Sequence, residues 1–309
     1  MIAVAIVSWN TRDLLRTCLT GAAGESPSEI VVVDNGSTDG SVDMVRTEFP
    51  AVRLEVLADN PGYGAAANHA MAVSTSTYLL LLNPDALVRP GALAALSRYL
   101  DQHPGAGVVG PRLLNADGTL QRSCHGFPRP WAPPLRRRAL VSWINRLGGV
   151  REWWLESWSH DRARAVPWVT GAALAIRREA FDAVGGFDER FHMYFEEVDL
   201  SYRLKKSGWE THFTPSAQVV HLGGASTEQC RPAMLLQSCI SQVDFFRAHY
   251  SGAGLGLALW LFRAATGARI ARDMVRYRLT PVGRRRTEMG ESLAVWRRAL
   301  ALPRTAART

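Results

Sequence analysis

The sequence predicts an α/β fold with a mostly parallel central sheet and helices on both faces, followed by a helical C-terminal region. Strand-like and helix-like patterns alternate at short intervals through the first half of the chain, which is typical of βαβ units. Residues 30–34 and 79–82 are apolar runs without polar alternation, as in strands buried on both faces. Each run leads to an acidic residue, Asp34 or Asp85, so two carboxylates are expected at one edge of the sheet.

The elements of the first half follow from local signals. Pro84 has no N–H to give to a sheet and therefore ends the fourth strand, whereas Pro90 suits the first turn of the helix that follows. We expect strands at Ile2–Ser8, Ile30–Asp34, 52–57, 79–82 and 108–109, and helices at 12–19, 64–73 and 90–102.

The rhythm breaks between residues 112 and 167, which are rich in Trp, Arg and Pro. This pattern indicates an insertion on or near the substrate side, or a surface excursion whose tryptophans cap the core. Regular patterns resume with a strand at 168–177, a turn at 185–188, a helix at 196–207 and a short strand at 219–221. We expect a domain of residues 1–230 and a helical, Arg-rich region over 231–309 that could associate with a membrane.

The composition is that of a folded globular protein, with 47% hydrophobic and 21% charged residues among 309. Nothing approaches the roughly 18 apolar residues needed to span a bilayer, and the apolar N-terminus is expected to be a strand and not a signal peptide. Four cysteines without metal-site spacing indicate reduced thiols in a cytoplasmic protein.

The net charge of +8 is concentrated at the C-terminal end. Residues 263–309 contain twelve Arg and three acidic residues, so the remainder is almost neutral. Such a tail indicates an anionic partner, either a membrane surface or nucleic acid. An RNA-binding role ranks low because no aromatic stacking platform accompanies these arginines.

Asp85 is the first candidate for chemistry, because a carboxylate after a rigid turn at a strand end is well placed to hold a divalent metal. An Asx turn leading into the next helix is an equally good explanation. Asp34 begins a loop whose glycines permit a tight turn. Its carboxylate could accept a hydrogen bond there from a base or from a ribose hydroxyl. The alternative is that Asp39 or Ser41 caps the next helix, which requires no ligand. Ligand binding by this loop and helix capping are compatible with each other.

Residues 60–64 are glycine-rich and precede a helix that carries Asn68, so backbone N–H groups there could approach a phosphate. The chain has neither a dinucleotide-binding glycine fingerprint nor a P-loop, which disfavours both of those chemistries.

The sharpest signal is the segment 191–203, in which Glu196 and Glu197 open a helix among aromatic residues. Acidic residues suit the first helical turn in any case, and Asp199 and Arg203 can pair four residues apart. A carboxylate desolvated by Phe191, Tyr194 and Phe195 would have a raised pKa, which suits a general base.

His221 closes another short apolar run. A lone histidine is more often structural, but close to Asp85 and a diphosphate it becomes a credible metal ligand.

Together these motifs resemble a family-2 glycosyltransferase with the GT-A fold. The matching segments cover most of residues 1–225 in the family's order: 5–10, 33–39, 60–62, 83–85, 186–188 and 191–203. The subgroup that they most resemble is the bacterial rhamnosyltransferases of cell-wall and surface polysaccharide assembly.

The resemblance implies a role for each candidate. Asp85 would be the metal-binding acid of the DXD motif, with Asn83 at its first acidic position, and His221 would complete the coordination of Mg²⁺ or Mn²⁺. Glu197 would be the general base, with Glu196 as the alternative. Asp34 would contact the nucleotide base, and the remaining donor-binding residues would be Ser8, Asn10, Asn35, Asn60, Gly62, Asn68 and Asn83.

The implied reaction is an inverting transfer of a sugar, with L-rhamnose from dTDP-rhamnose favoured, to a glycan or polyprenyl-diphosphate-linked acceptor. An Arg-rich tail behind the apolar residues 255–262 resembles a peripheral anchor at the cytoplasmic face of a membrane, or else a helical cap on the domain. Another hexose donor, a non-catalytic membrane-associated scaffold of an assembly complex and a nucleotidyltransferase are the alternatives. The last would need a basic glycine-rich loop where residues 9–12 stand.

Overall fold

The computed structural model describes residues 2–128, 158–223, 231–280 and 283–302, which form two compact units. One is an α/β unit made of residues 2–127, 158–192 and 196–223. The other is helical and contains residues 128, 193–195, 231–280 and 283–302. The sequence places its domain boundary at residue 230, yet the short segment 193–195 groups with the helical unit.

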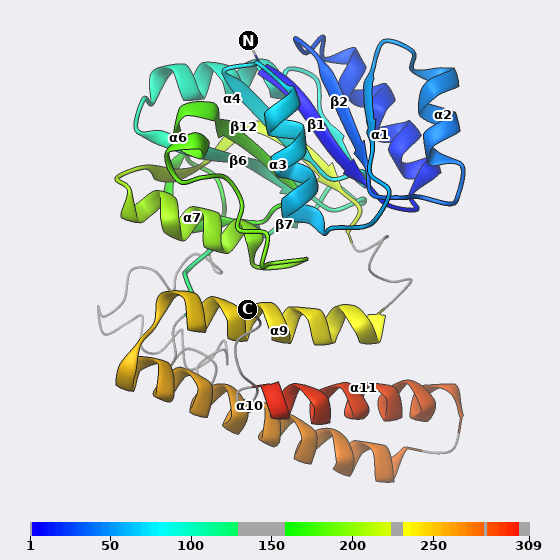
Figure 1. Cartoon of the computed structure of the whole chain (residues 1–309), viewed down its shortest axis with the longest axis vertical. Coiled ribbons are helices and arrows are strands. Elements are labelled where there is room, and N and C mark those ends of the chain that lie inside the picture. The colour runs from blue at the N-terminus through cyan, green and yellow to red at the C-terminus, as the bar shows by residue number, and fades with distance from the viewer. Residues whose placement is uncertain (1, 129–157, 224–230, 281–282, 303–309) are drawn as a thin grey trace. The chain divides into compact units, whose positions relative to one another are not determined.

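A ten-stranded sheet forms the centre of the α/β unit (Figure 1). Its strands are β1 (Ile2–Ser8), β2 (Ile30–Asp34), β3 (Arg53–Val56), β4 (Tyr78–Leu82), β5 (Ala86–Val88), β6 (Ala106–Leu114), β7 (Leu120–Gln121), β9 (Arg164–Val166), β11 (Ala173–Arg177) and β12 (Glu210–His221). The order is β3-β2-β1-β4-β11-β6-β12-β5, with β7 on β6 and β9 on β12. Neighbours among β3, β2, β1 and β4 are parallel, as are β6 and β12, while β11 is antiparallel to β4 and β6.

Helices cover both faces of the sheet, which confirms the predicted fold class. They are α1 (Arg12–Gly24), α2 (Ser41–Glu48), α3 (Tyr63–Val73), α4 (Ala92–Gln102), α6 (Arg178–Ala183) and α7 (Glu196–Lys206). Alternate residues of β1 enter two separate cores: Val4 and Ile6 pack with α1, α2 and α4, whereas Ala5 and Val7 pack with α3, α6 and α7. The period of two along a buried strand produces this division.

Three elements differ from expectation. The strand predicted at 168–177 is two strands, β10 (Trp168–Val169) and β11, separated by residues 170–172; β10 pairs with β8 (Cys124–His125). The short strand predicted at 219–221 is the end of the twelve-residue β12. The described ends of the predicted insertion, 112–128 and 158–167, include strands β7, β8 and β9, and residues 129–157 lie outside the described residues.

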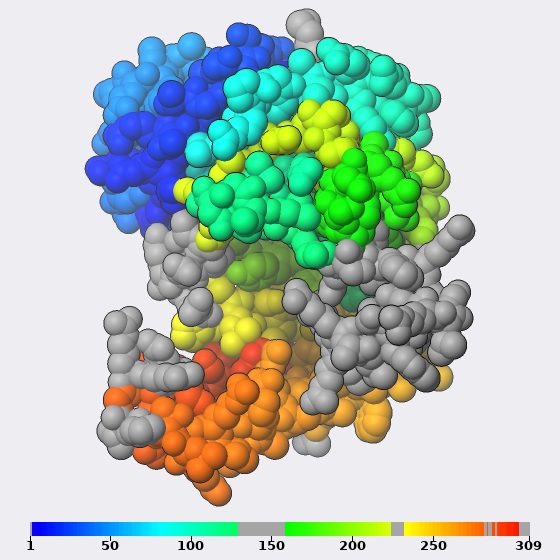
Figure 2. Space-filling view, turned by 180° about the vertical axis from the view of Figure 1, so that it is seen from behind, coloured from blue at the N-terminus to red at the C-terminus, as the bar shows by residue number. Residues whose placement is uncertain are grey.

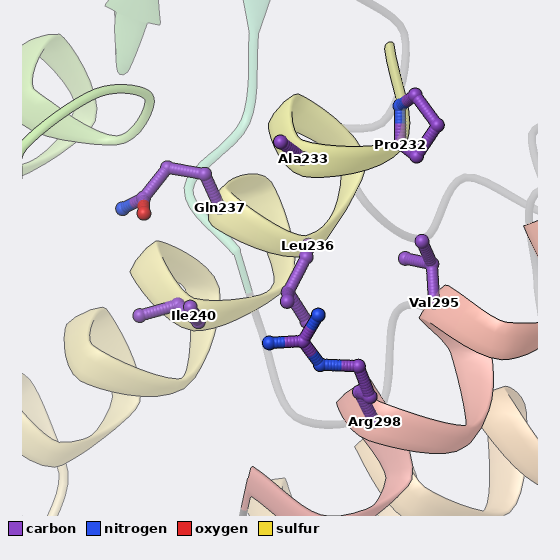
Figure 3. Close-up of a pocket in the computed structure, with 7 residues that line it drawn as sticks. All are labelled: Pro232, Ala233, Leu236, Gln237, Ile240, Val295 and Arg298. Carbon is purple, nitrogen blue, oxygen red and sulfur yellow. The ribbon is translucent and has the colours of Figure 1, made fainter. Parts of the chain in front are cut away.

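The helical unit contains α9 (Arg231–His249), α10 (Gly252–Leu279) and α11 (Arg284–Ala301), around a small core that includes Phe262 and Trp296. A cavity of about 380 Å³ lies between α9 and α11, and Figure 3 shows the Arg298 side chain extending from α11 toward Leu236. Within the described residues, no helix combines the length and hydropathy needed to cross a membrane.

Candidate active site

The two predicted acidic residues follow strands that end at the same edge of the sheet. Strand β1 pairs in parallel with β2 on one side, where Ser8 lies opposite Asp34, and with β4 on the other, where Ile6 lies opposite Leu82. The carboxyl ends of all three strands therefore meet, which is where open α/β sheets bind ligands. The predicted shared edge for Asp34 and Asp85 is present.

Asp34 is buried, with 1% of its surface exposed. Its Oδ1 accepts a 2.8 Å hydrogen bond from Ser37 N, which leaves Oδ2 buried without a hydrogen-bond partner. The neighbouring Asn35 donates from Nδ2 to Asn60 Oδ1 at 3.2 Å, and its own Oδ1 is also buried and unpartnered. Two adjacent unpaired acceptors form a site suited to a ligand that donates hydrogen bonds.

Asn10 joins the loops that follow β1 and β2. Its N–H donates to Ser37 Oγ and its Oδ1 accepts from Thr38 N, both at 2.8 Å. Asn10 has a φ of 51°, a left-handed conformation that asparagine tolerates better than most residues. Ser8 is buried and its hydroxyl bonds to that of Thr11 at 3.1 Å. Both predicted donor-site residues thus shape the edge through contacts within the protein.

Gly62 requires its lack of a side chain, because φ is 103° and a Cβ there would overlap the carbonyl of His192. Asn60 Oδ1 accepts from Gly62 N at 3.1 Å, and Tyr63 N donates to His192 O at 2.8 Å. The glycine-rich loop is therefore closed against the segment that precedes α7. No other residue type fits this approach of two backbones.

Asn68, a predicted donor-binding residue, holds a turn of the protein through its side-chain amide. Its Nδ2 donates to Phe187 O at 3.0 Å and to Glu189 Oε1 at 2.9 Å, and its Oδ1 accepts from Phe187 N at 2.8 Å. These three hydrogen bonds connect the turn at 185–189 to α3.

Asp85 and His221 are brought together by strand pairing. Strand β5 begins directly after Asp85 and runs antiparallel to β12, with Ala86 opposite His221, and Leu222 N donates to Asp85 O at 3.0 Å. As a result, His221 Nε2 lies 3.3 Å from Asp85 Oδ1, and both side chains are largely buried.

Gln121, on β7, sets the tautomer of His221. Its Nε2 donates to Asn115 Oδ1 at 3.1 Å and to His221 O at 3.2 Å, so its Oε1 is the atom that faces His221 Nδ1 at 2.7 Å. An amide oxygen only accepts, so the proton of neutral His221 lies on Nδ1 and the lone pair of Nε2 faces the Asp85 carboxylate.

These donors fit a divalent cation. In the neutral ring, Nε2 and the facing carboxylate oxygen suit Mn²⁺ or Mg²⁺, and the hydrogen bond on the other ring nitrogen is the usual means of orienting such a ligand. The described residues contain no group of three or more His, Cys, Asp or Glu that could hold a metal. This pair would therefore require substrate phosphate and water as the remaining ligands.

The two glutamates stand at the start of α7, as predicted. The residues before them, Tyr194 and Phe195, both have positive φ, 63° and 70°, a strained conformation that is typical of functional sites. Glu196 is buried at 7% exposure, whereas Glu197 is half-buried, and an Oε2 atom of each is buried without a partner.

Burial controls the protonation of both carboxyls. Desolvation, followed by the charge of Glu197, raises the pKa of Glu196 well above its ordinary value. Desolvation raises the pKa of Glu197 to about 7, against hydrogen bonds from backbone N–H groups that include Gly171. A carboxyl with this pKa is suited to accept a proton near neutral pH.

Asp199 has a separate, structural role. Its buried carboxylate accepts from Arg203 Nε at 2.6 Å, as the four-residue spacing predicts.

Tyr63 connects the part of the site around Asn83 and Asp85 with the glutamates of α7. The sequence did not indicate this role. Its hydroxyl donates to Asn83 Oδ1 at 3.1 Å. Burial raises its pKa well above 10, and the charges of Glu196, Glu197 and Asp85 add to the effect, so the phenol lies within the field of all three carboxyls. The turn at 170–172 makes a second connection, because Ala172 O accepts from Asn83 N at 3.0 Å and Gly171 lies against Glu197.

Comparison with known proteins decides the family. Residues 1–240 match the family described as Glycosyltransferase like family 2. This chain belongs to that family. It is 32% identical over 284 residues to the N-acetylglucosaminyl-diphospho-decaprenol L-rhamnosyltransferase of Mycobacterium tuberculosis, covering 87% of this chain and 90% of the relative.

A more distant relative and two solved structures agree with the family and with the fold, respectively. Rhamnosyltransferase WbbL of Escherichia coli K12 is 23% identical over 230 residues, with 72% of this chain and 83% of WbbL covered. The mannosyltransferase PcManGT of Pyrobaculum calidifontis, solved with GDP-Man and Mn²⁺, shares the fold, with a TM-score of 0.56 and 19% identity over 98% of this chain and 84% of that one. GalNAc-T7, solved with UDP, GalNAc and Mn²⁺, has a TM-score of 0.55 and 17% identity, with 72% of this chain and 43% of that one covered.

Proposed function

We propose that this glycosyltransferase moves L-rhamnose from dTDP-rhamnose onto a glycan or polyprenyl-diphosphate-linked acceptor in polysaccharide assembly, with inversion at the anomeric carbon. The names of the Mycobacterium tuberculosis and Escherichia coli relatives support the sugar, and the former supports a lipid-diphosphate acceptor. The reaction class rests on two observations: Asp34 and Asp85 follow strands that end at one edge of the sheet, and Tyr63, which bonds to Asn83, lies within the field of Asp85 and the two glutamates of α7.

Glu197 is the general base of this proposal. Its unpartnered Oε2 takes the proton of the acceptor hydroxyl while that oxygen forms a bond to the anomeric carbon. The bond from this carbon to the diphosphate breaks in the same step, and the nucleoside diphosphate leaves. Glu196 is the more deeply buried of the two and its pKa is raised well above its ordinary value, whereas the half-buried Glu197 is more accessible to an acceptor hydroxyl, which favours Glu197 for this role.

Asp85 and His221 would hold Mg²⁺ or Mn²⁺. When bound, such a cation neutralises charge on the departing diphosphate. Gln121 holds His221 in the tautomer that presents Nε2, and Tyr63 fixes the side chain of Asn83 two residues before Asp85.

The nucleotide would lie along the ends of β1 and β2. Asp34 Oδ2 and Asn35 Oδ1 are the unpaired buried acceptors there, and they match the N–H donor of a thymine base and the hydroxyl of its sugar. Asn10 and the turn of Asn60 and Gly62 form the walls of this site.

Peripheral attachment at the cytoplasmic face of the membrane completes the proposal. A lipid-linked acceptor is confined to that surface, and the helical unit supplies arginines for an anionic one.

Thermal stabilisation by nucleotide-sugars, with and without Mn²⁺, tests the proposal. We expect dTDP-rhamnose to raise the melting temperature most, and only with metal. Asp85→Ala should lose the metal-dependent increase together with transfer. A larger shift with another nucleotide-sugar would reassign the donor, and no shift with any of them would overturn the active site.

A further inference from the structure

One face of α10 is not buried by the packing of the helical unit. Ala258, Phe262 and Thr266 face inward and are buried, so they define the side of α10 that packs on the core. The opposite side is exposed and apolar over the whole helix. We name it the α10 stripe, and it consists of Ala253, Leu257, Trp260, Ala264, Ala268, Ala271, Val275 and Leu279.

The spacing of three or four residues puts the α10 stripe on one face of a helix that is about 40 Å long. Its large members are well exposed, with 63% of Trp260 and 78% of Leu279 accessible. The apolar run at 255–262 is thus divided by the fold, since Phe262 packs inside while Leu257 and Trp260 face out. Figure 2 shows α10 in orange, open to view along much of its length.

Arginines border the C-terminal third of the α10 stripe on both sides. At 100° per residue, Arg272 and Arg276 lie along one border and Arg278 along the other. Arg272 pairs with the adjacent Asp273 at 2.8 Å. Arg276 and Arg278 are exposed and have no acidic partner among the described residues. Arg269, by contrast, lies 4.4 Å over the ring of Trp296 and belongs to the packing of the unit.

We propose that the α10 stripe binds an anionic lipid surface, with the helix axis in the plane of the membrane. An apolar face with a tryptophan, flanked by arginines, buries its apolar groups at the level of the headgroups while the guanidinium groups meet lipid phosphates. A second copy of the stripe fits less well, because the sequence of α10 contains one acidic residue, Asp273, which pairs with Arg272, so the second copy would not supply a further carboxylate for the bordering arginines. The inference deepens the membrane attachment in the proposed function.

Two substitutions that add the same charge test this inference. Ala264→Glu places a carboxylate in the middle of the α10 stripe, whereas Ala294→Glu places one at an exposed position of α11, outside the stripe. The probe is co-sedimentation of the whole protein with phosphatidylcholine vesicles that contain about one third phosphatidylglycerol, and with vesicles of phosphatidylcholine alone.

We expect binding to the anionic vesicles only, weakened by salt, roughly tenfold weaker in Ala264→Glu and unchanged in Ala294→Glu. Equal binding by the two variants, or binding that ignores lipid charge, would overturn the proposal. A third result would also overturn it: wild type does not bind vesicles but forms a dimer in analytical ultracentrifugation, and Ala264→Glu dissociates that dimer. The stripe would then be an interface between two copies of the chain.

The paired variant Leu257→Gln with Trp260→Gln removes the apolar groups without a change of charge, and it should also lose binding. Circular dichroism and melting temperature establish that each variant is folded. Stabilisation by nucleotide-sugar is measured on the same samples, so a failure of membrane binding is distinguished from a failure of the proposed donor site.

Discussion

His221 Nδ1 donates a 2.7 Å hydrogen bond to Gln121 Oε1, and this contact turns Nε2 toward Asp85. Gln121→Leu removes the acceptor while it preserves much of the side-chain volume. We expect the affinity for Mn²⁺ to fall by about tenfold or more, as is usual when the residue that orients a metal-binding histidine is lost. Titration of Mn²⁺ by electron paramagnetic resonance, with nucleoside diphosphate present, measures this.

Gln121→Glu is the matched control, because it keeps an oxygen opposite Nδ1 and should retain more metal affinity than Gln121→Leu. Equal affinities in wild type and Gln121→Leu would contradict the positioning role. An NMR spectrum of the imidazole nitrogens reports which nitrogen carries the proton, a property that loss of packing alone would not change. In wild type, the proton of the neutral ring should be on Nδ1.

Glu197 and Glu196 are adjacent in sequence but unequal in the site, since Glu197 is half-buried and lies against Gly171, whereas Glu196 is buried. Glu197→Gln should lower kcat by about 10² to 10⁴, the usual contribution of a general base, while stabilisation by donor is retained. Glu197→Asp, which is shorter by one methylene, should keep measurable turnover. Single-turnover assays on purified enzyme compare these variants with Glu196→Gln, and near-normal turnover in Glu197→Gln would assign the base elsewhere.

The pH dependence follows from the raised pKa of Glu197. A base acts in its deprotonated form, so kcat should rise with pH and reach half of its plateau near the pKa of about 7. An unperturbed glutamate would instead give a rate that is flat above about pH 5.5. A rate profile from pH 5 to 9, in buffers of constant ionic strength, measures the midpoint.

The parts of the site that could be predicted from sequence are those set by local signals. Asp34 and Asp85 follow unbroken apolar strands, and parallel strands bring their ends to one edge whatever else the chain does. The paired glutamates follow from the start of α7. Each of these depends on a short stretch of chain.

The rest depends on contacts between distant segments. His221 reaches Asp85 because β5, a three-residue strand too short to recognise, pairs with the end of β12. Gln121 is one hundred residues from His221, on a two-residue strand, and nothing in its neighbourhood indicates a role. Tyr63 lies within a recognised motif, but its bond to Asn83 and its position among three carboxyls require the tertiary structure.

Glu196 should cost stability at neutral and alkaline pH. Its pKa is raised in the folded protein, so its favourable contribution is complete below the unfolded value of about 4.3 and is lost as pH rises through the folded pKa. Glu196→Gln remains neutral throughout. Its melting temperature should therefore match wild type near pH 4 and exceed it by a growing margin as pH rises above the unfolded pKa of about 4.3. The same substitution at the exposed Glu291 of α11 is the control and should show no such trend; a constant difference across pH would contradict the assignment.

A comparison of Gly62 with Gly91 tests whether the close approach of the glycine-rich loop to residue 192 is what requires glycine at position 62. Both have positive φ, 103° and 81°, so alanine is strained at either position. A Cβ at position 62 would in addition overlap the His192 carbonyl, whereas a Cβ at position 91 has no neighbour within 4 Å. Gly91→Ala should cost about 1 kcal/mol of unfolding free energy, and Gly62→Ala clearly more. Urea unfolding measures both.

Because Tyr63 adjoins Gly62 and bonds to Asn83, Gly62→Ala should also weaken stabilisation by nucleotide-sugar, and Gly91→Ala should not. Equal costs and equal donor responses in the two variants would show that the approach to His192 is not what requires glycine here.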